Sequence, residues 1–353
     1  METYQFNVIK FLIISALGAG ISILAAVPLI NFLYRIKFWK KKAREKTMTG
    51  EKADVFYSLH KEKEISTPRG GGILIWGSVT ILIFSLFFLS QFIEIPWIKG
   101  LNFLSRSQTW LPLFTLIAGS IVGLADDILQ VFTRGRYVGG GMSFWRRLAI
   151  VALIGLIGGA WFYFKLEKDT IHVPLVGDFK IGILYLPLFV VVTLSCWSGG
   201  VIDGLDGLSG GIFAAIFGSF SIIALSQGKA DLAVFCGAII GSLFAFLWFN
   251  IPPARFYMGE TGILGLTSTM AVVSFLTDSV LVLPIIAGIL VIEVSSVILQ
   301  LLSKKFRKKK IWLCTPIHHH FEAKDWPSHK VTMRFWILGV VMAIIGTAIR
   351  LIG

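Results

Sequence analysis

SGGVIDGLDGLSGG, from Ser198 to Gly211, decides the fold, because it places two aspartates and several glycines between two apolar segments. The flanking segments, 181–198 and 210–226, contain no charged residue. In the hydrocarbon of a bilayer, each charge or unpaired backbone group costs several kcal/mol, so irregular polar backbone occurs only at an interface or around a cavity. Asp203 and Asp206 are therefore expected at a membrane surface, as candidates for a functional site.

The composition indicates an integral membrane protein. Of the 353 residues, 55% are hydrophobic and 15% are charged, whereas soluble domains average about 25% charged residues. The cysteines Cys196, Cys236 and Cys314 are scattered without CxxC spacing, which argues against a disulfide framework and against a thiolate metal site. The first apolar run lacks the pattern of a cleaved signal peptide, so we interpret it as a retained span.

The apolar segments predict an all-α bundle that forms a single domain over residues 1–353. A helix needs roughly 20 apolar residues to cross about 30 Å of hydrocarbon. Ten segments meet this requirement: 9–33, 72–93, 110–131, 148–165, 181–198, 210–226, 231–251, 262–278, 280–302 and 333–352. The short connections at 226–231 and 277–279 predict tight helical hairpins, and the alternating segment 168–182 predicts a small external β-hairpin around Val176–Asp178.

Basic residues fix the expected orientation. The first polar loop is rich in Lys and Arg, which predicts a cytoplasmic location by the positive-inside rule. Counting ten spans then places five loops in the cytoplasm and both termini outside: 34–71, 132–147, 199–209, 252–261 and 303–332. The net charge of +13 is explained by these loops, which set topology and meet anionic lipid. Without a soluble domain or interleaved aromatic residues, we expect no nucleic-acid partner.

Acidic residues gather at the cytoplasmic ends of the spans. Asp126 and Asp127 lie at the end of the third span, in GLADDILQ. Their side chains point about 100° apart on a helix, so we expect them to have different roles. A solvated helix end is the alternative. FNIPPARFYMGETG brings Asn250, Tyr257 and Glu260 to the same side, where Glu260 is either a site residue or a first-turn acid of the eighth span.

Three consecutive histidines, His318, His319 and His320, lie in the last cytoplasmic loop. Adjacent imidazoles rarely converge on one tetrahedral ion and the HExxH spacing is absent, so we do not expect a zinc site. Imidazoles beside lysines bind anions or exchange protons near neutral pH. Together with the acids and the basic loops, they supply the residues of metal-dependent phosphoryl transfer, and the oxygen ligands favour Mg²⁺.

These motifs resemble the polyprenyl-phosphate N-acetylhexosamine-1-phosphate transferases over essentially the whole chain. The resemblance includes STPRGGG at 66–72, the ADD of the third span, DGLDGLSGG and FNIPPARFYMGETG. PIHHHFEAKDWPSHKVTMRFWI, from Pro316 to Ile337, is its most specific part and looks like the muramoyl-pentapeptide branch.

The resemblance implies ten transmembrane helices in the bacterial cytoplasmic membrane and a cytoplasmic active site that uses Mg²⁺. The implied reaction transfers phospho-MurNAc-pentapeptide from UDP-MurNAc-pentapeptide to undecaprenyl phosphate, giving lipid I and UMP. Whether the transfer is direct or passes through an aspartyl-phosphate stays open. So does the oligomeric state, for which a homodimer is one alternative.

The resemblance also implies a role for each matched residue. Catalysis falls to Asp126, Asp127, His318, His319 and His320, with Asp126 favoured to deprotonate or position the lipid phosphate. Glu260 and Asp127 are the expected metal ligands. The expected substrate-binding residues are Thr67, Arg69, Arg147, Asp203, Asp206, Asn250 and Tyr257.

Several positions depart from the family pattern. Glu260 stands where the family has a metal-binding Asp, Gln130 and Arg147 replace lysines, and Gly200 replaces an asparagine. Arg134 or Arg69 could supply the cation that is lost at position 130.

Two rival functions remain. TPRGGG is closer to the enzymes that transfer N-acetylglucosamine-1-phosphate from UDP-GlcNAc for another surface polymer. A transporter is the alternative from another class, although its charges should lie at the membrane centre, where only Glu293 is found. We expect Glu293 either to make a helix-bundle contact or to line a lipid groove.

Overall fold

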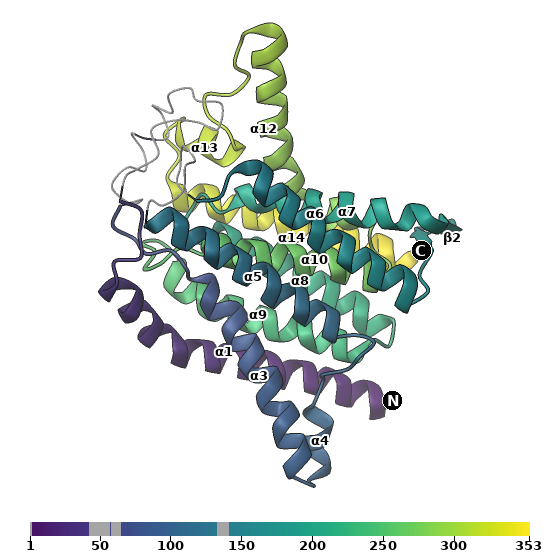
Figure 1. The fold of residues 1–353 in the computed structure, drawn as a ribbon. Coiled ribbons are helices and arrows are strands. Elements are labelled where there is room, and N and C mark those ends of the chain that lie inside the picture. The colour runs from purple at the N-terminus through teal and green to yellow at the C-terminus, as the bar shows by residue number, and fades with distance from the viewer. Residues whose placement is uncertain (1, 42–56, 58–64, 133–140) are drawn as a thin grey trace.

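The computed structural model describes residues 2–41, 57, 65–132 and 141–353 and shows a bundle of long helices (Figure 1). The basic residues Arg44, Lys46, Arg134 and Arg136 of the expected cytoplasmic loops lie outside these residues. The helices are α1 (Glu2–Arg35), α3 (Gly72–Phe92), α4 (Pro96–Leu101), α5 (Trp110–Val131), α6 (Phe144–Ala160), α7 (Tyr185–Ser198), α8 (Leu208–Ser226), α9 (Ala230–Asn250), α10 (Gly259–Leu276), α11 (Leu283–Ile286), α12 (Gly288–Arg307), α13 (Ile317–Glu322) and α14 (Ser328–Ile352).

Among the described residues, nine helices are long and apolar enough to cross a membrane, which confirms an all-α, multi-pass membrane protein. The expected span 280–302 is divided instead: α11 ends before Ala287, and α12 begins after it and stands away from the bundle (Figure 1). Helix α12 buries a polar stripe of Glu293, Ser296, Gln300 and Ser303 and ends in the basic residues Lys304, Lys305 and Arg307, so it is not a uniformly apolar span. Both termini lie at the same end of the bundle (Figure 1).

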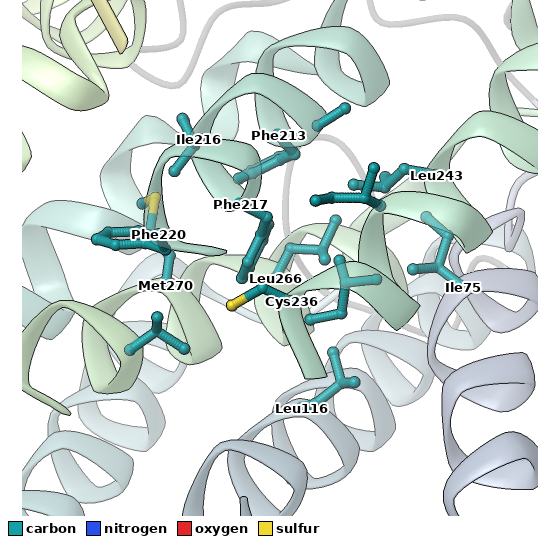
Figure 2. Packing of buried hydrophobic residues seen from close by; sticks show 14 of the residues in the cluster. Ile75, Leu116, Phe213, Ile216, Phe217, Phe220, Cys236, Leu243, Leu266 and Met270 are labelled. Atoms are coloured by element: carbon teal, nitrogen blue, oxygen red, sulfur yellow. The ribbon is translucent and has the colours of Figure 1, made fainter. Parts of the chain in front are cut away.

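Helices α8, α9 and α10 form the centre of the bundle. In their most apolar windows 72%, 83% and 89% of the residues are buried, against 28% in α1 and α14. Figure 2 shows how Phe213, Phe217 and Phe220 of α8 pack toward side chains of α9 and α10. The outer helices expose apolar side chains because lipid, rather than protein, is expected to surround them.

One of the two expected tight helical hairpins is present, whereas the connection expected at 277–279 extends over 277–282 and leads to the short α11. Helices α8 and α9 are joined by three residues, 227–229, as expected for a tight hairpin. Strands β1 (Thr170–Val173) and β2 (Gly177–Lys180) pair antiparallel, with Thr170 opposite Lys180. The β-hairpin is confirmed, although its turn lies at 174–176. All three cysteines are free.

Helices α5 and α10 approach each other closely through glycine. A methyl group on Gly123 would lie 2.1 Å from the carbonyl oxygen of Glu260, and one on Gly119 would lie 2.7 Å from that of Leu264. The Thr261 hydroxyl donates to the Ser120 carbonyl over 2.9 Å, which closes the contact. Small residues allow such backbone approach in membranes. The contact fixes the end of α5, with its two aspartates, beside the start of α10.

Gly123→Ala tests this contact against Gly77→Ala, whose added methyl meets nothing within 4 Å on α3. We expect Gly123→Ala to lower the free energy of unfolding by about 1–3 kcal/mol, because the backbone of α10 must move. Gly77→Ala should be neutral or stabilising by up to ~1 kcal/mol. Thermal unfolding in detergent measures both, and equal unfolding temperatures would show that α5 and α10 do not need to touch.

Candidate active site

Asp127 closes the N-terminus of α10. Its Oδ1 accepts the Glu260 N–H over 3.1 Å, and its Oδ2 accepts the Thr261 N–H over 3.0 Å. The first N–H groups of a helix have no partner inside the helix and carry partial positive charge, so a carboxylate there is doubly favourable. Asp127 is buried, and the residue before the helix, Met258, has no side chain that can cap it. Both oxygens of Asp127 are thus engaged in holding α10.

Asp126 points elsewhere, as the spacing on the helix predicts. Its Oδ2 accepts a hydrogen bond of 2.9 Å from Gln130 and lies 3.5 Å from the Arg147 guanidinium. Its Oδ1 accepts the Met142 N–H. Gly141 makes room for this contact, since it has φ +82° and a methyl group there would lie 2.6 Å from Oδ1.

Arg147 bridges two acids. Its Nη1 lies 2.9 Å from Oε1 of Glu260 and 3.5 Å from Oδ2 of Asp126. The Arg147 side chain is 9% exposed and that of Glu260 24% exposed, so solvent screens the pair only in part. The two residues that differ from the family pattern, Arg147 and Glu260, therefore form an ion pair with each other. Through Arg147, Asp126 of α5 is linked to Glu260 of α10.

Arg69 enters the site from the TPRGGG segment. Its Nη1 donates to the Gln130 side-chain oxygen, and Gln130 in turn donates to Asp126. The segment is held to the start of α10, because the Tyr257 N–H donates to Pro68 and the Gly71 N–H donates to Tyr257, over 2.8 and 2.7 Å. The positive charge of Arg69 also acts on Asp203 and Glu260. Arg69 thus places a positive charge beside Gln130, at the position where the family has a lysine.

Thr67 and Tyr257 meet in the same segment, where their side chains share a hydrogen bond. Burial raises the pKa of the Tyr257 phenol well above its usual range. The phenol therefore stays neutral, and it can act as a hydrogen-bond donor near the site.

The DGLDG loop lies against the first turn of α10 and the segment before it. Asp203 accepts the Gly259 N–H over 3.2 Å and the Ser209 hydroxyl over 2.8 Å, and Asp206 accepts the Ala254 N–H over 3.4 Å. Burial raises the pKa of Asp203, while Ser209 and the charge of Arg69 oppose that rise. Both aspartates thus lie in the cluster that the sequence predicts.

Asn250 links the loop to the segment before α10. Its Oδ1 accepts the Gly207 N–H over 2.9 Å, and its Nδ2 donates to the Phe256 carbonyl over 2.8 Å. It is 2% exposed. Its amide therefore binds protein backbone on both sides, and its effect on a nucleotide would pass through the two loops.

Two of the three histidines reach the DGLDG loop. A methyl group built on Gly204 would lie 2.2 Å from Nε2 of His318 and 3.0 Å from Nε2 of His319. His320 instead accepts the Leu313 N–H over 3.2 Å, away from the loop. Burial lowers the pKa of His320, with the charge of Lys324 adding to the effect.

Sequence reasoning missed three participants: Gln130 as a relay, the Met142 N–H and Glu322 beside His319. The position of Gln130 four residues after Asp126, on one helix face, was the available signal. At position 200, a methyl group would lie 2.4 Å from Ile263, so Ile263 fills the space that a side chain would need.

The donor chemistry fits a hard divalent cation. Within the described part of the chain, no three His, Cys, Asp or Glu side chains are arranged to hold a metal. Mg²⁺ does not require this, because it commonly uses one or two carboxylates with water and substrate phosphates. Glu260 fits best, since Arg147 contacts only its Oε1 and the side chain is partly exposed. Asp127 fits less well because both its oxygens hold α10.

Comparison with known proteins gives consistent matches. Residues 109–278 match glycosyl transferase family 4. The chain is 33% identical over 347 residues to a phospho-N-acetylmuramoyl-pentapeptide-transferase of Bacillus pumilus, covering 98% of both proteins. It is 34% identical over 288 residues to the protein of that name from Levilactobacillus brevis, covering 81% of this chain and 84% of the relative. A Geobacillus protein of the same name is 31% identical over 337 residues.

Proposed function

The chain belongs to the phospho-N-acetylmuramoyl-pentapeptide-transferase family, and from this premise we propose that it makes lipid I and UMP from UDP-MurNAc-pentapeptide and undecaprenyl phosphate. The observation that carries the proposal is the cluster in which Asp126, Glu260, Arg69 and Arg147 meet at one end of the bundle. The protein would act in the bacterial cytoplasmic membrane, with this end facing the cytoplasm.

The cations of the cluster would hold the donor. Arg69 and Arg147 would neutralise the pyrophosphate, since guanidinium groups suit phosphate oxygens. Asp203 and Asp206, with Tyr257 and Thr67, would orient the nucleotide, while Asn250 fixes the loops around it. His318 and His319 would meet the phosphates from the DGLDG side.

Asp126 would position the acceptor and take its proton where one is present. An oxygen of the lipid phosphate then bonds to the β-phosphorus as the bond between that phosphorus and the UMP oxygen breaks. Phosphoryl transfer depends mainly on position and on charge stabilisation, which a cluster of fixed charges supplies. A two-step route would use a carboxylate of the same cluster as the first acceptor.

Glu260 would hold Mg²⁺, which when bound supplies positive charge to the pyrophosphate and the departing UMP. The protein's own part is to keep the carboxylate partly accessible and to balance its charge with Arg147.

UMP release with each of two donors tests the function. With undecaprenyl phosphate present, UDP-MurNAc-pentapeptide should react at least about tenfold faster than UDP-GlcNAc, a difference of ~1.4 kcal/mol. Preference for UDP-GlcNAc would assign the chain to the other sugar, as TPRGGG would suggest. Substrate uptake into proteoliposomes without UMP would instead indicate a transporter.

Variants of Asp126 and Asp127 should have different effects: the first mainly on UMP release, and the second mainly on the free energy of unfolding. Asp126→Asn should lower UMP release by about 10²–10⁴-fold through loss of a proton acceptor, with a smaller loss of unfolding free energy than Asp127→Ala because one acceptor oxygen is kept. Asp127→Ala should lower the free energy of unfolding by about 2–4 kcal/mol, because two buried N–H groups of α10 lose their acceptors. Near-normal turnover in Asp126→Asn, or unchanged stability in Asp127→Ala, would contradict the assignment.

Glu260 variants test the metal proposal. Glu260→Asp keeps a carboxylate and should keep Mg²⁺-dependent UMP release, whereas Glu260→Ala should raise the Mg²⁺ concentration needed for half-maximal activity by about tenfold or more. Titration of UMP release against Mg²⁺ measures both variants. An unchanged requirement in Glu260→Ala would remove Glu260 from the metal site.

A further inference from the structure

Two adjacent histidines each face a buried carboxylate. Nδ1 of His318 lies 2.9 Å from Oε2 of Glu293, and Nδ1 of His319 lies 2.7 Å from Oε2 of Glu322. The centroids of the two imidazole rings are 4.1 Å apart. Glu322 is itself held by the Ser328 hydroxyl over 2.6 Å. The same ring atom therefore faces an acid in both residues, although the acids come from different helices, α12 and α13.

The Nε2 atoms of His318 and His319, on the far side of each ring from Nδ1, lie close to the same residue. Both Nε2 atoms approach Gly204, where an added methyl group would lie 2.2 and 3.0 Å from them. Gly204 stands between Asp203 and Asp206 in the DGLDG loop. Within the described residues, Nε2 of His318, like its Nδ1, has no hydrogen-bond partner although the side chain is fully buried. A buried polar atom without a hydrogen-bond partner lowers the free energy of unfolding by about 1–3 kcal/mol, so a ligand that bonds to this nitrogen would be stabilised.

Glu293 has no other charged contact in the described residues. It is fully buried, and its neighbour Leu290 packs against Gly199 at the start of the same loop. Its contact with His318 lies within ion-pair distance but lacks the alignment of a hydrogen bond. A buried carboxylate without a partner is strongly destabilising, so the histidine explains why the acid is tolerated inside α12. The observed contact is therefore with α13 (Ile317–Glu322) in the last polar loop, and not with a membrane-spanning helix of the bundle.

We propose that Glu293 is a positioning residue, which holds His318 so that Nε2 is presented at the DGLDG loop to the phosphates of the donor. An ionised carboxylate attracts an N–H and repels a nitrogen lone pair, so we expect Nδ1 of His318 to carry a hydrogen and Nε2 to face the DGLDG loop. Glu322 does the same for His319. The proposal rests on the proposed function for the identity of the ligand, while the pairing itself does not.

Glu293→Gln tests the proposal, with Ser296→Ala as the control. Ser296 is buried one turn further along α12, and its hydroxyl bonds to the Glu293 carbonyl. We expect Glu293→Gln to lower kcat for UMP release by about 10- to 100-fold with KM changed less than about threefold, and Ser296→Ala to be near wild type. Glu293→Asp should retain intermediate activity, and it replaces Glu293→Gln if that variant does not fold.

A double-mutant cycle separates positioning from a general structural effect. In a His318→Ala background, Glu293→Gln should cause little further loss, because the residue through which it acts is gone. An equal loss in both backgrounds, or no loss in the wild-type background, would overturn the proposal.

The ¹⁵N spectrum of histidine-labelled protein gives a readout that needs no turnover. The His318 signal, identified by its loss in His318→Ala, should report a hydrogen on Nδ1 and should shift in Glu293→Gln but not in Ser296→Ala. If wild type releases no UMP while this shift occurs, the proposed function fails and the pairing stands. If the signal is the same in Glu293→Gln, the pairing fails.

Discussion

The N-terminus of α10 is the constraint on which the rest of the structure depends. Its first three N–H groups belong to Gly259, Glu260 and Thr261, of which Gly259 and Thr261 are buried, and they have no acceptor within the helix. Asp203 accepts the first and Asp127 accepts the other two. Two carboxylates from segments far apart in sequence must therefore meet there. Once they meet, Asp126 with Arg147, Arg69 through Gln130, and the DGLDG loop all lie near the same helix end.

Much of this could be predicted from sequence, because hydropathy alone fixes the spans and the positive charges suggest which ends share a side. The small hairpin and the free cysteines were also predictable from local pattern. The division at Ala287 was not, since α12 is apolar in composition but buries its polar face: Glu293, Ser296, Gln300 and Ser303. Nor could sequence show that Asp127 caps a helix or that Arg147 reaches Glu260, 113 residues away, because such pairs depend on how helices pack. Periodicity carries no information about these distances.

The departures from the family pattern are mutually consistent in the structure. Gln130 cannot supply a charge, but it connects Arg69 to Asp126 and so brings another cation near. Glu260 reaches further than an aspartate, and Arg147 meets it at 2.9 Å. Gly200 leaves a space that Ile263 fills. Each change is thus accompanied by a neighbour that restores charge or packing, which is why the departures are compatible with an active transferase.

Five loops form a single donor site around the start of α10 in the proposed mechanism. An experimental density map of the protein with UDP-MurNAc-pentapeptide bound tests it most directly. We expect the pyrophosphate to lie between the guanidinium groups of Arg69 and Arg147 and the Nε2 atom of His318, with Asp127 still hydrogen-bonded to the first turn of α10. A pyrophosphate bound away from these residues, or an α10 whose first turn is not held by Asp127, would contradict it.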